Sequence, residues 1–97
     1  MTDINFKVND NGKTINVKYK GENTCEYFMR DFTKKNTNYE SVDCNIYLFK
    51  VNGRILNNKD GKLLKTPLKD IITEDQIIRF VRKKILVIQK KIKQIKN

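Results

Sequence analysis

The side chains that usually carry catalysis are few and scattered in this chain. It has no histidine, Ser41 is its one serine, and Cys25 and Cys44 show neither a C-x-x-C spacing nor metal-ligand neighbours. The carboxylates fall in turns rather than in a group with metal-ligand spacing, and no glycine motif for nucleotide phosphates is present. We therefore expect no enzymatic activity, no cofactor, no metal and no small-molecule substrate.

The two cysteines and the N-terminal residues indicate the cellular compartment in which the protein is expected. Cys25 follows a predicted helix start, where a thiol pKa is often lowered, but burial beside Phe28 is the simpler interpretation. We expect both cysteines to be free thiols in a reducing environment. The first residues do not resemble a signal peptide, and no apolar stretch is long enough for a transmembrane helix. These features predict an intracellular, cytoplasmic protein, with a cytoskeletal or nuclear location left open.

Positive charge is concentrated at the C-terminal end of the chain. The formal net charge is +10 over 97 residues. Residues 79–97 hold eight Lys or Arg and no acid, whereas the first 78 residues hold thirteen basic and eleven acidic residues. This distribution predicts a nearly neutral folded body followed by a cationic tail, which is a candidate contact region.

The first half of the chain predicts a hairpin and a helix. Apolar and polar residues alternate over residues 4–8 and 15–19, and Asn11-Gly12 between them favours a tight turn. Thr24 is a predicted helix N-cap. Phe28 and Phe32 lie on one face of that helix, which we expect to end near Asn36.

The second half predicts three more strands. Residues 46–51 form a predicted strand, Asn52-Gly53 a tight turn and residues 54–56 a short returning strand. Residues 57–61 are predicted to open a polar loop, and the leucines around Pro67 to pack as an irregular turn under the sheet. Residues 76–82 are the last predicted strand. The order β-β-α-β-β-β indicates one α+β domain, which we assign to residues 3–84.

Residues 85–97 are predicted to form a basic amphipathic helix. Four isoleucines fall within an arc of about 80°, with lysines outside it. The alternative is that residues 85–88 extend the last strand, because they are β-branched in character. A helix this short is marginal alone in water, so its apolar stripe must pack on the body or on a partner. The stripe comprises Ile85, Ile88, Ile92 and Ile95, and the lysines outside it are Lys90, Lys91 and Lys93.

The order of elements resembles the ubiquitin-like β-grasp family over residues 3–84. The resemblance depends on the Thr24 cap with Phe28 and Phe32, on residues 48–56 and on the closing strand at 78–82. It implies a mixed five-stranded sheet packed on one helix. Doublecortin-like β-grasp domains are a second resemblance, because residues 50–54 fit their turn almost as well. That resemblance implies a microtubule partner.

Two departures from the ubiquitin pattern affect the expected function. The family's C-terminal diglycine is missing, since residues 83–86 read Lys-Lys-Ile-Leu, so covalent conjugation is not expected unless another precursor exists. Lys50 and Arg79 stand where the family's apolar recognition patch has isoleucine and histidine, while Val81 stays apolar. With Lys7 and Lys18, these residues predict a basic outer sheet face, which is either a solvated surface or a docking surface for an acidic partner.

We therefore expect a non-catalytic adaptor or structural subunit that docks on an acidic protein surface in a larger complex. A microtubule or ciliary complex is one specific form of this hypothesis. Packing of the tail on its own body, nucleic-acid binding and a modifier with an atypical C-terminus are the alternatives. Membrane binding is less expected, because the tail has no aromatic anchor. The expected partner-binding residues are Lys50, Arg79, Val81 and Arg82 on the sheet, and Ile88, Lys90, Lys91, Ile92, Lys93 and Ile95 in the tail.

Overall fold

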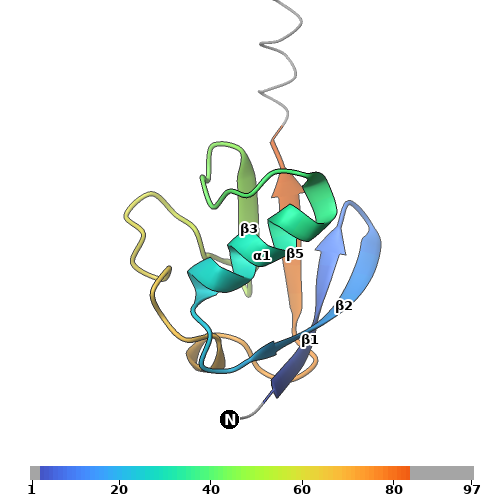
Figure 1. The fold of residues 1–97 in the computed structure, drawn as a ribbon, viewed down its shortest axis with the longest axis vertical. Coiled ribbons are helices and arrows are strands. Elements are labelled where there is room, and N and C mark those ends of the chain that lie inside the picture. Colours follow the sequence, from blue (N-terminus) through green and yellow to red (C-terminus); the bar gives the residue numbers. More distant parts are fainter. Residues whose placement is uncertain (1–2, 84–97) are drawn as a thin grey trace, which may run out of the picture.

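One α-helix lies across one face of a five-stranded sheet (Figure 1). The structure is a computed structural model that describes residues 3–83. The predicted tail helix and its six candidate binding residues lie outside the described residues. The elements are β1 (Asp3–Asp10), β2 (Lys13–Lys20), α1 (Cys25–Thr37), β3 (Tyr47–Val51), β4 (Arg54–Ile55), the 3-10 helix η1 (Leu68–Asp70) and β5 (Ile77–Arg82).

The sheet is mixed, with the strand order β2-β1-β5-β3-β4. β1 and β2 pair antiparallel along their whole lengths, and β5 joins β1 in parallel and β3 antiparallel. At the hairpin turn both Asn11 and Gly12 have positive φ, 54° and 88°, which suits a tight turn matched to the twist of the strands. The predicted α+β class and the predicted element order are confirmed.

The helix begins at the predicted cap. The Tyr27 N–H donates to Thr24 Oγ1 at 3.1 Å, which satisfies one of the free amides of the first turn. After Thr37 the chain leaves the helix through Asn38, whose φ of 64° is left-handed. The helix therefore ends one residue beyond the predicted Asn36.

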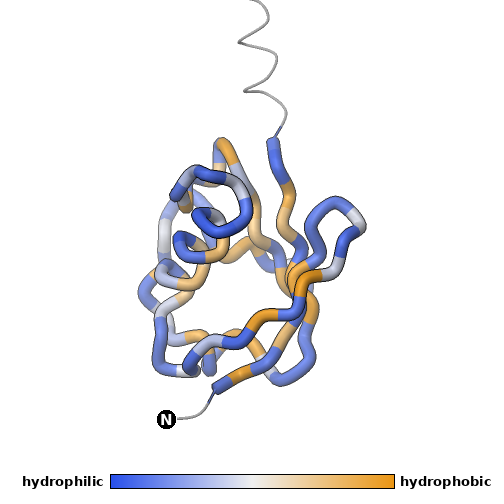
Figure 2. Tube along the Cα trace, turned by 45° about the vertical axis from the view of Figure 1, so that its right-hand side comes forward, coloured by the Kyte–Doolittle hydropathy of each residue, from blue (hydrophilic) through white to orange (hydrophobic). Residues whose placement is uncertain are grey.

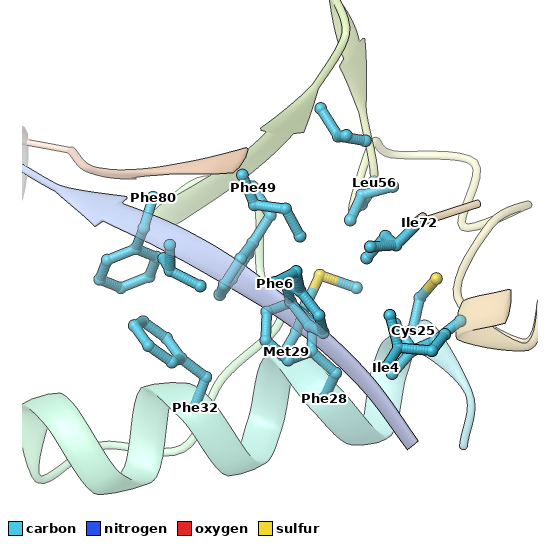
Figure 3. Close-up of a cluster of buried hydrophobic side chains, with 14 of the residues drawn as sticks. Ile4, Phe6, Cys25, Phe28, Met29, Phe32, Phe49, Leu56, Ile72 and Phe80 are labelled. Carbon is cyan, nitrogen blue, oxygen red and sulfur yellow. The ribbon is translucent and has the colours of Figure 1, made fainter. Parts of the chain in front are cut away.

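The core lies between α1 and the inner face of the sheet and is rich in aromatic rings (Figure 3). The Phe28 ring lies 5.3 Å from that of Phe6 and 5.7 Å from that of Phe49, both edge to face. Phe32 meets Phe80 in the same way at 5.3 Å. Hydrophobic segments lie on the strands and on the helix, and the hairpin turn is hydrophilic (Figure 2). The two helix phenylalanines thus fix the helix on the sheet, as their spacing predicted.

Asn57 departs from the prediction of a polar loop, because its side chain is buried at 2% exposure. Its Oδ1 accepts from the Phe49 N–H at 3.1 Å, and its Nδ2 donates to the Tyr47 carbonyl at 2.9 Å and the Val42 carbonyl at 3.1 Å. β4 is only two residues long, so it leaves this part of the β3 edge without a strand partner. The Asn57 amide supplies the missing hydrogen bonds.

Thr33 offers a stability test within the helix. Its Oγ1 is buried and has no hydrogen-bond partner among the described residues. Thr33→Val keeps the shape and removes the unpaired hydroxyl, so we expect the free energy of unfolding to rise by about 1 kcal/mol. In a domain of this size, thermal denaturation followed by circular dichroism should show a Tm about 4–8 °C higher.

Thr37→Val is the matched control for that variant. The Thr37 Oγ1 donates to the Thr33 carbonyl at 2.7 Å, so the same substitution there removes a made hydrogen bond and should lower the Tm. A Tm that falls in both variants would show that the Thr33 hydroxyl is paired in solution.

Candidate functional site

The face of the sheet opposite α1 carries three of the four sheet residues that the sequence predicted to bind a partner: Lys50, Arg79 and Val81. Strand residues alternate between this face and the core, and none of the outward residues is buried. We call them the outer face. They are Asp3, Asn5, Lys7 and Asn9 of β1, Thr14, Asn16, Lys18 and Lys20 of β2, Leu48 and Lys50 of β3, Ile55 of β4, and Ile77, Arg79 and Val81 of β5.

Five bases and one acid stand on the outer face. The acid, Asp3, lies opposite Lys20 at one end of the hairpin. Lys7 has an ion-pair partner, Asp75, in the loop before β5, at 3.8 Å. Within residues 3–83, no carboxylate lies within ion-pair distance of the other four bases, Lys18, Lys20, Lys50 and Arg79. The outer face is therefore positive and mostly uncompensated.

Lys50 and Arg79 stand directly opposite each other in the β3–β5 pairing. Opposed residues on one face of an antiparallel pair have Cβ atoms about 4.5–5.5 Å apart, and like charges in this arrangement destabilise the sheet. The fold thus holds two cations side by side with no described acid between them. We call these two residues the cation pair.

Four aliphatic residues surround the cation pair. Leu48 and Val81 form the next outward pair along β3 and β5, and Ile55 lies opposite Lys50 on β4. Ile77 lies two residues before Arg79 and is 55% exposed, one of the few large apolar side chains so exposed within residues 3–83. The sequence reasoning chose Val81 alone from this set. Alternation around the buried Phe49 would have placed Leu48 on the outer face from sequence alone. Ile55 and Ile77 could be placed there only from the strand register.

Arg82 does not join the outer face, although the sequence prediction grouped it with Lys50 and Arg79. It follows Val81 directly, so strand alternation turns it to the other side. Its Nη2 lies 2.8 Å from Asp10 Oδ2, and its guanidinium lies 5.4 Å from the centre of the Phe80 ring. The hydrogen bonds that Arg82 donates to the Asp10 carboxylate raise the pKa of Arg82. Arg82 therefore ties the end of β5 to the hairpin turn.

The two acids of α1, Glu26 and Asp31, are paired with bases. Glu26 contacts Lys65 at 3.0 Å and Arg30 at 3.2 Å, and these hydrogen bonds lower the pKa of its carboxyl. Burial acts to raise the pKa of Asp31, but hydrogen bonds from Tyr19 at 2.7 Å and Lys35 at 3.0 Å outweigh it, so that pKa is also lowered. These two carboxylates are thus compensated by neighbouring bases, in contrast to the uncompensated bases of the outer face.

Two hollows adjoin the outer face. One of about 320 Å³ lies between β1 and β2 and includes Lys7, Lys18 and Asp75. The other, of about 860 Å³, lies between the hairpin turn and the end of β5 and includes Lys13 and Arg79. Both are lined largely by polar and basic side chains, so they extend the cationic character of this side.

The described residues offer little for catalysis. Within residues 3–83, no group of three or more His, Cys, Asp or Glu side chains is placed to hold a metal ion. Burial raises the pKa of the Cys25 thiol to about 11, and the charge of Asp70 adds to the effect, so Cys25 stays protonated at neutral pH. Both cysteines are free. In the described part of the chain, no helix has the length and apolarity to cross a bilayer.

Comparison with solved structures identifies the fold. The chain is similar to the ubiquitin-like domain of an Arabidopsis thaliana protein, determined by solution NMR, with a TM-score of 0.63 and 18% identity over 86% of this chain and 80% of that one. It is also similar to a de novo design based on ubiquitin, with a TM-score of 0.60 and 20% identity over 84% of this chain and 89% of the design. No protein-family model and no curated protein sequence matches the chain. The fold is the ubiquitin-like β-grasp fold, as the sequence resemblance implied.

Proposed function

We propose that this chain is a non-catalytic ubiquitin-like interaction module that docks on an acidic protein surface through its outer face. The observation that carries the proposal is the outer face itself, where Lys18, Lys50 and Arg79 have no described acidic partner. Among residues 3–83, the side chains off the outer face comprise eleven bases and ten acids, so the excess positive charge is concentrated on the outer face. Such an asymmetry steers association toward negative surfaces.

The cation pair decides which class of partner is compatible. An apolar partner that covered Lys50 and Arg79 would remove two charges from water without pairing them, which is strongly unfavourable. A partner that supplies carboxylates offsets that desolvation with charge-assisted hydrogen bonds. The surface therefore favours acidic partners over the apolar faces that suit an isoleucine-centred patch.

The tail contributes to the proposal from its sequence alone. Ile88, Ile92 and Ile95 would supply apolar anchoring, and Lys90, Lys91 and Lys93 would add positive charge beside them. In this form the protein is an adaptor or structural subunit that holds an acidic component of a larger assembly. A microtubule or ciliary assembly is the specific form we propose, because polymerised tubulin presents a repeated acidic surface.

Cosedimentation of the full chain with polymerised tubulin tests this form. We expect saturable binding that weakens as salt rises from about 50 to 200 mM, because charges at the surface are screened. The Ile88→Ser/Ile92→Ser variant should bind more weakly if the tail contributes, and unchanged binding would exclude that contribution. Equal affinity for duplex DNA at the same salt would contradict a protein-specific surface and favour nucleic-acid binding.

A further inference from the structure

We propose that the cation pair and its aliphatic neighbours together form a receptor for one acidic residue flanked by aliphatic residues on an extended partner segment. The proposal rests on the proposed function and specifies the ligand of the same surface. It distinguishes a mixed acidic and aliphatic ligand from a simple run of acids. The partner segment would read aliphatic-x-acid-x-aliphatic, where x is any residue.

The cation pair provides two donors for one carboxylate. Lys50 and Arg79 leave the sheet from opposed positions, and no carboxylate of residues 3–83 occupies either. A carboxylate has two oxygens, so one can accept from the planar guanidinium while the other accepts from the ammonium. A pair of cations that the sheet itself disfavours gains most from a single anion placed between them.

The aliphatic residues set the spacing of the ligand. Along β5 the outward side chains are Ile77, Arg79 and Val81, which read aliphatic, cation, aliphatic at every second residue. Outward residues two apart on a strand are separated by about 6.6 Å, and the same spacing holds for alternate residues of an extended peptide. A peptide that runs along β5 can therefore place one acid at Arg79 and an aliphatic residue at each side.

Leu48 and Ile55 add apolar surface beside the cation pair, on the side of β3 and β4. Both are half-buried, so each leaves part of an apolar surface open beside the cation pair. A polyacidic segment would lay additional carboxylates over these aliphatic side chains, where they lose water without gaining a partner. An acid between aliphatic residues avoids that cost and buries apolar area on both sides.

Three synthetic peptides distinguish the mixed ligand from charge alone. The first carries Leu-Ser-Glu-Ser-Leu, the second replaces its Glu by Gln, and the third is Ser-Glu-Glu-Glu-Ser. Titration into the full-length chain, followed by amide chemical shifts, reports both affinity and location. We expect the first peptide to shift the amides of Lys50, Arg79 and Val81, and the other two to bind at least tenfold more weakly.

Two charge-conserving variants complete the test. Leu48→Thr/Val81→Thr removes aliphatic surface at strand-compatible positions, and Arg79→Lys keeps the charge but removes the guanidinium fork. Each should weaken the first peptide severalfold, with amide dispersion confirming the fold. If the triple-glutamate peptide binds as tightly as the first and both variants are neutral, the mixed-ligand proposal fails while acidic docking stands. If no acidic peptide shifts the outer face, both proposals fail.

Discussion

Replacing Asn57 by alanine is expected to lower the free energy of unfolding by about 3–4 kcal/mol, the largest stability effect we predict at a polar side chain. The substitution leaves the Phe49 N–H and the Tyr47 and Val42 carbonyls without their partner at the edge of β3. Each buried group left unpaired costs about 1–3 kcal/mol. Since small domains are stable by only about 5–15 kcal/mol, the loss is a large fraction of the total.

Urea denaturation of Asn57→Ala and Asn58→Ala measures this effect. Asn58 follows directly in the chain but is exposed, and its side chain makes no hydrogen bond within the described residues. We expect a change within about 0.5 kcal/mol for Asn58→Ala. A loss below about 1 kcal/mol for Asn57→Ala would show that water or a strand shift replaces the amide.

Lys50→Glu is expected to act in opposite directions on stability and on partner binding. The variant converts an opposed like-charge pair into an opposed Glu–Arg79 pair, which should stabilise the sheet by about 0.5–1 kcal/mol. The same change removes one donor of the docking surface and adds a repulsive charge. We expect affinity for an acidic partner to fall about a hundredfold, or ~3 kcal/mol.

Lys59→Glu is the control for this variant because it changes the net charge equally from an exposed loop outside the outer face. Thermal denaturation and partner binding are measured on both variants. We expect Lys59→Glu to retain most of the binding. Equal losses in the two variants would indicate that overall charge, rather than the cation pair, governs association. A Tm that falls in Lys50→Glu would contradict the repulsion that we assign to the pair.

Local patterns were sufficient to predict most of the fold. The hairpin follows from strict alternation on both sides of Asn11-Gly12, and the helix follows from the Thr24 cap with Phe28 and Phe32 at helical spacing. These features act over two to four residues, so they are visible without tertiary context. The order of elements then resembled the ubiquitin-like β-grasp family, and that resemblance implied one mixed sheet.

The features that the sequence did not reveal depend on distant parts of the chain. Asn57 is buried because β4 stops after two residues and leaves β3 in need of hydrogen bonds, which nothing near Asn57 signals. The Asp10 partner of Arg82 lies 72 residues away. Alternation alone would have separated Arg82 from Arg79, but the residues were grouped by charge. Ile55 and Ile77 joined the candidate surface only through strand register.

Site-specific photo-crosslinking in native cell extract tests the central claim most directly. A photoreactive residue at Ile77 lies on the outer face, and one at the exposed Glu40 lies in the loop after α1. Our account predicts one defined adduct from position 77, in which the crosslinked partner segment contains acidic residues, and its yield should fall sharply in the Lys50→Glu background. An adduct from position 40 alone, or an adduct from position 77 that Lys50→Glu leaves unchanged, would contradict docking through the outer face.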